Sequence, residues 1–171
     1  MLRFGSPIVA RTLYGLVVIV RIVTLAWAAT QLPDRIATHF GASGAADGWG
    51  TREGYLALDI ALSAALVLGL PMLAGLLARG SGAGINIPHK DYWLRPENRE
   101  RFRARLSVDM LFFGGATGLL LSWVDVELVR ANALAVPALG NSIVIPTVIF
   151  VVAMLAYSVW MVTVRYAVPA R

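Results

Sequence analysis

Four long apolar stretches constrain the fold of this chain more than any other feature of its sequence. They cover residues 13–30, 55–78, 108–126 and 142–164. A helix of about 20 residues rises roughly 30 Å, which is the thickness of the hydrocarbon core of a bilayer. Hydrophobic residues make up 58% of the chain and charged residues only 15%, whereas soluble domains have about 25% charged residues. The sequence therefore predicts an all-α integral membrane protein with four transmembrane helices in a single membrane domain.

A secretory signal peptide is the alternative interpretation of the first stretch. The run Ala26-Trp27-Ala28 resembles a cleavage site flanked by small residues. Arg21, however, interrupts the apolar core that such a signal needs. We therefore expect a retained transmembrane helix.

The distribution of basic residues predicts the orientation of these helices. Seven of the fifteen Lys and Arg residues lie in the segment 79–107, and loops 31–54 and 127–141 together carry only three. Four more lie at the two ends of the chain: Arg3, Arg11, Arg165 and Arg171. Because cytoplasmic loops are enriched in Lys and Arg, we expect both termini and the basic segment 79–107 in the cytoplasm of a bacterial cell, and the other two loops outside. The net charge of +5 then reflects membrane topology rather than binding to nucleic acid.

The basic segment contains the least generic run of the chain, NIPHKDYWLRPENR at 86–99. Pro96 suits the first turn of a helix, and Glu97 can pair with Arg101 one turn later. We expect a short helix that lies on the bilayer surface and leads into the third transmembrane helix. Anionic lipids would attract its basic side chains, by about 1 kcal/mol each. A docking surface for a membrane or cytosolic protein is the alternative, formed by Asn86, Pro88, Lys90, Tyr92, Trp93, Pro96, Glu97 and Arg99.

Loop 31–54 has the composition of an ordered loop with tight turns. It contains five glycines and the pair Asp47-Gly48, which favours a turn. The run at 36–40 suits an extended strand, so the sequence predicts a short hairpin that turns at Asp47-Gly48.

The same loop holds groups that metal sites and acid–base catalysts use. They are His39 and the carboxylates Asp34, Asp47 and Glu53. A zinc site or a general acid–base pair needs several such groups at suitable spacing, and this loop has a single histidine. We expect a structural role for His39, and no metal, cofactor or catalytic residue.

Arg21 lies near the middle of the first apolar stretch. A charge at that depth costs about 2.5–3.5 kcal/mol on insertion scales, so we expect it to face other helices. Asp59 and Asp109 are the candidate partners, and Asp59 is favoured. A structural ion pair is the simplest interpretation, and a proton or ion path is the alternative. Gly114 and Gly118 are spaced for close helix packing, within the chain or in a homo-oligomer.

Two groups of residues resemble the bacterial family known as domain of unknown function 1648. The first group is Leu32, Pro33, His39, Phe40, Gly44 and Asp47. The second group is Asn86, Pro88, Lys90, Tyr92, Trp93, Pro96, Glu97 and Arg99. The resemblance implies a small polytopic membrane protein. It also implies a likeness to the N-terminal part of SdpI-type immunity proteins, which protect cells against secreted toxic peptides and take part in signalling.

These observations predict a non-enzymatic membrane protein with a regulatory, immunity-like or accessory role. We expect it to recognise a partner through loops 31–54 and 79–107. The alternative is a small transporter or channel subunit that uses Arg21 with Asp59 or Asp109 and assembles through the face that carries Gly114. A metalloenzyme on the outer face is a third possibility, and it would require a bound metal.

Overall fold

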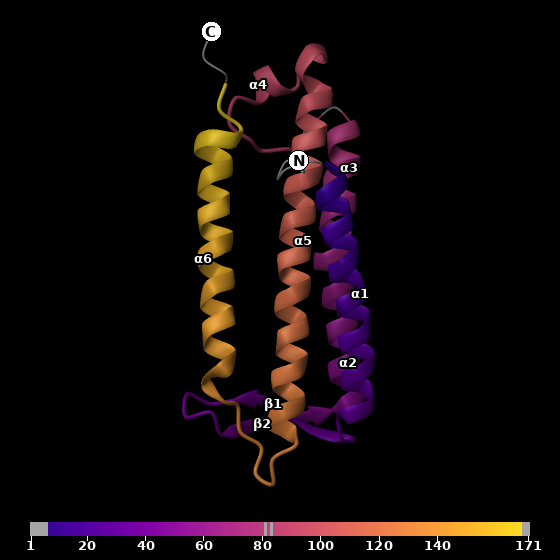
Figure 1. The fold of residues 1–171 in the computed structure, drawn as a ribbon, viewed down its shortest axis with the longest axis vertical. Helices are drawn as coiled ribbons and strands as arrows, with labels where there is room; N and C mark the ends of the chain where they lie inside the picture. The colour runs from indigo at the N-terminus through magenta and orange to yellow at the C-terminus, as the bar shows by residue number, and fades with distance from the viewer. Residues whose placement is uncertain (1–6, 81, 83, 169–171) are drawn as a thin grey trace.

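The computed structural model describes residues 7–80, 82 and 84–168, and it arranges them as upright helical rods with a β-hairpin at one end (Figure 1). Arg3 and Arg171, which entered the prediction of orientation, lie outside the described residues. The elements in chain order are α1 (Pro7–Gln31), β1 (Arg35–Phe40), β2 (Ala46–Thr51), α2 (Arg52–Leu62), η1 (Ser63–Gly69), α3 (Leu70–Arg79), α4 (Lys90–Trp93), α5 (Pro96–Asn132), η2 (Asn141–Ile143), α6 (Val144–Trp160) and η3 (Met161–Arg165).

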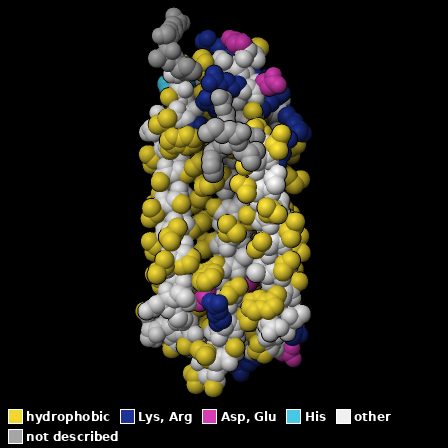
Figure 2. All heavy atoms as spheres, viewed as in Figure 1, with side chains coloured by type: hydrophobic (Ala, Val, Ile, Leu, Met, Phe, Trp, Pro, Cys, Tyr) yellow, Lys and Arg dark blue, Asp and Glu magenta, His cyan; other side chains and the backbone are white. Residues whose placement is uncertain are grey.

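Within the described residues, four helical rods are long and apolar enough to cross a membrane. They are Pro7–Gln31, Arg52–Arg79, Pro96–Asn132 and Asn141–Arg165, so the prediction of four transmembrane helices is confirmed by length and composition. The hairpin and the 133–140 loop lie at one end, which we call the hairpin end (Figure 1). Residues 79, 80, 82, 84–107 and 161–168 form the basic end, where α1 begins and η3 ends. Lys and Arg side chains gather at the basic end, and hydrophobic side chains cover the middle (Figure 2).

The second rod contains a proline, Pro71, within its apolar stretch. Immediately before Pro71, the helix widens into the π-helical turn η1, in which the Leu70 N–H bonds to the Ala65 carbonyl. Proline has no N–H, so the α-helical donor to the Val67 carbonyl is missing. The Tyr14 hydroxyl of α1 donates to that carbonyl instead, at 2.7 Å. A neighbouring helix thus satisfies the group that the proline leaves open.

The third rod is longer than the sequence predicted. The expected surface helix and the expected transmembrane helix are one continuous helix, α5, with 37 residues. At a rise of about 1.5 Å per residue it is about 55 Å long, so both of its ends pass beyond a hydrocarbon core of about 30 Å. It forms the centre of the bundle, with α1 and the second rod packed against it (Figure 1).

Two glycines allow that close packing. A Cβ atom on Gly114 would lie 2.8 Å from the Val67 carbonyl oxygen, and one on Gly118 would lie 3.0 Å from a methyl carbon of Val17. Both glycines are buried within the chain. The face that carries Gly114 is therefore an internal packing surface, and the expectation that subunits assemble through it is wrong.

The hairpin makes the description of the fold as all-α incomplete. Strands β1 and β2 pair antiparallel, with Ile36 opposite Gly50. The chain turns at 41–45, where Gly44 adopts a φ of 81° that favours glycine. The expected turn at Asp47-Gly48 is wrong, because both residues lie inside β2. Gly48 is needed there for a different reason, since a Cβ would lie 2.7 Å from that of His39.

The hairpin is fastened to the bundle along its inner edge. Ile36 and Ala37 are fully buried against the ends of α1 and α5. The Asn132 side chain at the end of α5 accepts a hydrogen bond from the Ala37 N–H at 2.7 Å and donates to the Ala37 carbonyl at 3.1 Å. At the tip, the Leu139 N–H donates to the Gly44 carbonyl at 2.8 Å. The hairpin is therefore a fixed layer on the bundle.

The fourth rod stands apart from the others (Figure 1). None of the residues of α6, all of which the structure describes, is buried. It touches α5 at separate levels. Ser142 bonds to Glu127 near the hairpin end, and Tyr157 stacks on Phe112 with ring centroids 4.2 Å apart. Most of the α6 surface is thus left for the bilayer.

Candidate functional site

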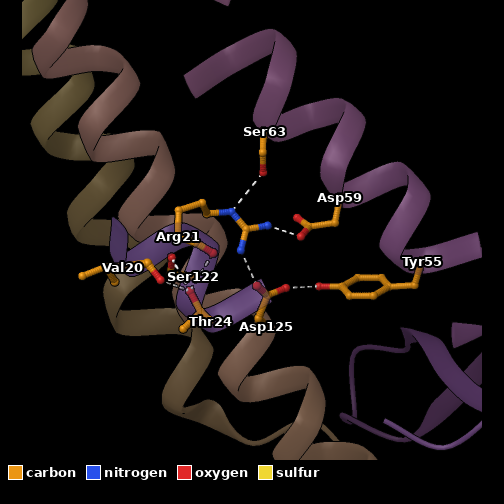
Figure 3. Close-up of polar contacts among 8 residues, drawn as sticks. All are labelled: Val20, Arg21, Thr24, Tyr55, Asp59, Ser63, Ser122 and Asp125. Carbon is orange, nitrogen blue, oxygen red and sulfur yellow. Dashed lines mark hydrogen bonds and ion pairs between the residues drawn. The ribbon is translucent and has the colours of Figure 1, made fainter. Parts of the chain in front are cut away.

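The most unusual feature of the bundle is a buried cluster of charges around Arg21. The Arg21 side chain enters the bundle from α1 and is 4% exposed. One terminal nitrogen pairs with Asp59 of α2 and the other with Asp125 of α5 (Figure 3). Its Nε donates to Ser63 Oγ of η1 at 3.0 Å. A single guanidinium therefore joins the first three rods. Its several N–H donors, held in one plane, suit it to bind several acceptors at once.

Hydroxyl groups extend this cluster on both sides. The Tyr55 hydroxyl donates to Asp125 Oδ1 at 2.6 Å, and the Thr24 hydroxyl donates to Ser122 Oγ at 3.0 Å (Figure 3). We call Arg21, Tyr55, Asp59 and Asp125 the Arg21 cluster. It contains two carboxylates and one guanidinium, so a negative charge remains if all three groups are ionised. A charge in an apolar environment is costly unless it is paired, and this cluster has one carboxylate more than its guanidinium balances.

The sequence identified only part of this cluster. The expected partner Asp59 is present, whereas Asp125, near the end of the third apolar stretch 108–126, was not among the candidates. The spacing of polar residues around Asp59 could have identified two other members, Tyr55 and Ser63. Tyr55, Asp59 and Ser63 recur every four residues and therefore share one face of the second rod.

Asp109 belongs to a second buried cluster and does not meet Arg21. It lies 16 positions before Asp125 on α5, which is about 24 Å along the helix. Its two oxygens accept hydrogen bonds from the hydroxyls of Tyr157 at 2.7 Å and Tyr166 at 2.6 Å, and Arg165 Nε lies 2.6 Å from it. Burial, followed by the bond to Asp109, raises the pKa of the Tyr166 phenol and keeps it a donor. We call these four residues the Asp109 cluster.

The carboxylates of the outer loop do not converge on its histidine. His39 pairs with Asp47 on an exposed part of the hairpin, whereas Asp34 and Glu53 lie 3.0 and 3.2 Å from Arg52. In the part of the chain that the structure describes, no three His, Cys, Asp or Glu side chains gather in a way that would hold a metal ion. Of the other motif residues, Leu32 is buried, Phe40 and Gly44 are half-buried, and Pro33 is exposed.

The hairpin presents an aromatic and charged surface. The Arg35 guanidinium lies over the Trp49 ring, 5.1 Å from its centroid, and Trp49 is 47% exposed. The exposed pair His39 and Asp47 lies farther along the same two strands. We call Arg35, His39, Asp47 and Trp49 the hairpin surface.

Of the eight residues expected to dock a partner at the basic end, Trp93 is buried, and the others are exposed or half-buried. Trp93 has no exposed surface, and its indole N–H donates to the Tyr166 carbonyl at 2.8 Å. The expectation that Trp93 contacts a partner is therefore wrong, because its ring fills the core between α4 and the end of the chain. Arg99 donates to the Gly80 carbonyl. Asn86, Pro96 and Glu97 are exposed, and Pro88, Lys90, Tyr92 and Arg99 are half-buried.

These features define a mostly helical multi-pass membrane protein with buried charge clusters and a small hairpin domain at one end. Residues 16–62 match the family model described as Domain of unknown function (DUF1648). The match supports the predicted family over residues 16–62, which contain the hairpin together with Arg21, Tyr55 and Asp59; the second motif, at 86–99, lies outside the matched part. No curated protein and no solved structure matches the chain, so the likeness to SdpI-type immunity proteins remains a prediction.

Proposed function

We propose that this chain is a non-enzymatic bacterial membrane protein that recognises a protein partner through its hairpin surface, in a regulatory, immunity-like or accessory role. The observation that carries the proposal is the exposed Trp49 ring beneath Arg35, on a hairpin that Asn132 fastens to α5. Trp and Arg are the residue types that most often dominate binding at protein interfaces. A fixed hairpin also loses little conformational entropy when it binds.

The proposed orientation places the hairpin surface outside a bacterial cytoplasmic membrane. It follows from the excess of Lys and Arg at the basic end, since these residues favour the cytoplasmic side. The partner is then a membrane or extracytoplasmic protein. The basic end, with Trp93 inside its core, serves as the anchor on the cytoplasmic side.

The test is to extract the protein into lipid nanodiscs and to identify co-purifying proteins by mass spectrometry. We expect a partner that is recovered with the wild type and is at least about tenfold depleted with Trp49→Ala, the scale of a hot-spot residue. Val136→Ala is the matched control, because Val136 is also highly exposed at the hairpin end but lies outside the hairpin surface. An identical set of proteins with all three samples would refute the proposal.

The second candidate is a small transporter or channel subunit that uses the Arg21 cluster. The specific observation in its favour is the surplus carboxylate of that cluster, within rods that are apolar enough to span a membrane. Ionisable groups at such positions often mark proton or ion paths. The path would begin at Asp59 or Asp125 and does not include an Arg21–Asp109 pair.

Proton uptake by proteoliposomes under an imposed membrane potential tests this candidate. Asp125→Asn should abolish any uptake that the wild type supports, because it removes the surplus ionisable group. Asp47→Asn, which removes a carboxylate from the hairpin surface, should leave the uptake unchanged. Uptake no greater than that of empty vesicles would rule out this candidate.

A further inference from the structure

A cavity of about 310 Å³ opens at the basic end between α1, α3 and α5. Among its described lining residues are the arginines Arg11, Arg79 and Arg103, one from each helix, together with Glu100 and Ser107. It is separate from both the Arg21 cluster and the Asp109 cluster. We call it the arginine pocket.

Small residues keep the arginine pocket open. Ala74 and Ala78 of α3 line it, and a Cβ atom on Gly75 would meet no other atom within 4 Å. These short side chains therefore leave the space between the helices unfilled. The space is open enough to admit a group the size of a phosphate.

The guanidinium groups differ in how firmly they are held. Arg103 donates from Nε to the Ala78 carbonyl at 2.9 Å and from Nη2 to the Arg79 carbonyl at 3.3 Å, so it is fixed at the end of α3. The side chains of Arg11 and Arg79 are exposed. With Glu100 as the carboxylate among the lining residues, the arginine pocket carries a net positive charge.

The position of the arginine pocket favours an amphiphilic ligand. Arg11 is in the second turn of α1, and Arg79 is the last residue of α3. On the side toward the membrane, α3 presents exposed apolar residues, among them Met72 and Leu76. A ligand with an anionic head and hydrocarbon chains would place its head among the arginines and its chains along α3.

We propose that the arginine pocket binds the phosphate group of an anionic phospholipid. Guanidinium groups match the geometry of phosphate oxygens and remain charged at all physiological pH values. Basic pockets between transmembrane helices at a membrane surface are suited to such head groups. This site differs from general attraction to an anionic surface, because it holds one lipid at a defined place.

The test is native mass spectrometry of the full chain in detergent, titrated with phosphatidylglycerol or phosphatidylcholine. We expect one phosphatidylglycerol molecule to be retained, and Arg11→Gln/Arg79→Gln to weaken its binding by about tenfold or more, since each basic group near an anionic head contributes. Arg95→Gln/Arg101→Gln is the matched control, because it removes the same charge from exposed positions of the basic end that do not line the arginine pocket. Equal losses in the two double variants, or equal binding of the two lipids, would overturn the proposal.

Two further measurements keep the proposal testable if the first variant folds poorly. Glu100→Gln removes the carboxylate from the arginine pocket and should strengthen binding of phosphatidylglycerol by about threefold, in line with one unfavourable charge. Unchanged or weaker binding would contradict the proposal. Inorganic phosphate at millimolar concentration should not displace the lipid. Full displacement would assign the arginine pocket to a free phosphate instead of a lipid.

Discussion

The Arg21 cluster and the Asp109 cluster are built from the same kinds of side chain, yet their charges balance differently. Each joins carboxylate, guanidinium and tyrosine groups across rods that are far apart in the sequence. The Asp109 cluster has one carboxylate and one guanidinium among its four residues, and it ties α6 to α5. The Arg21 cluster has two carboxylates around one guanidinium. A cluster with equal numbers of carboxylates and guanidinium groups is explained by its role in holding helices together. The surplus carboxylate of the Arg21 cluster needs a further explanation.

Removal of Arg21 should have the largest effect. Arg21→Met leaves Asp59 and Asp125 buried without their cation, and loss of one partner from a buried ion pair typically costs about 3–5 kcal/mol. The free energy of unfolding in detergent micelles, followed by circular dichroism, measures this loss. The triple variant Arg21→Met/Asp59→Asn/Asp125→Asn removes all three charges and should recover most of the stability. A stable Arg21→Met protein would show that the cluster does not hold the rods together.

A matched pair of Asp→Asn variants tests the difference in charge balance directly. Asp109→Asn leaves Arg165 without its carboxylate and should cost about 2 kcal/mol, the scale of a broken buried contact to a charged group. Asp125→Asn leaves Arg21 paired with Asp59 and should cost less than about 1 kcal/mol. Both are measured as unfolding free energies under the same conditions. Equal costs would mean that the surplus charge of the Arg21 cluster is neutralised in another way.

The smallest expected difference within a pair of variants is the one between the tyrosines of the two clusters. Tyr55→Phe removes the hydrogen bond to Asp125 Oδ1 and should cost about 1–2 kcal/mol, because a buried acceptor loses its donor. Tyr157→Phe should cost about 0.5–1 kcal/mol, because Asp109 Oδ1 still lies 2.6 Å from Arg165. Thermal unfolding of both variants in one detergent provides the comparison. The reverse order would indicate that Asp109 depends on Tyr157 more than the contacts indicate.

The transmembrane rods were predictable because hydrophobicity over about 20 residues is a strong signal. The length of α5 was not predictable in this way. Residues 96–107 belong to the same helix, but they are too polar to be recognised as part of a transmembrane stretch by hydropathy. The turn of the hairpin was misplaced for a related reason. Asp47-Gly48 is a strong local turn pattern, but the strand pairing requires Gly48 opposite His39.

The candidate sites were harder to predict than the rods, because burial depends on tertiary contacts. A tryptophan next to basic residues, such as Trp93, is typical of the membrane surface. In the structure, however, Trp93 is buried in a core with Phe102 and Tyr166. Asp59 could be favoured over Asp109 as a partner of Arg21, because the long arginine side chain would reach outward along the helix to meet it. Asp125 lies within the predicted stretch 108–126, but only the packing of α5 against α1 places it beside Arg21.

The bond between Tyr14 and Val67 has a consequence for the order in which the chain assembles. Because Pro71 leaves the Val67 carbonyl without its α-helical donor, the second rod depends for that bond on a hydroxyl from α1. The ribosome makes α1 first, so this hydroxyl is already in the bilayer when the second rod enters. Insertion from the N-terminus onward therefore supplies the second rod with the donor that its Val67 carbonyl lacks.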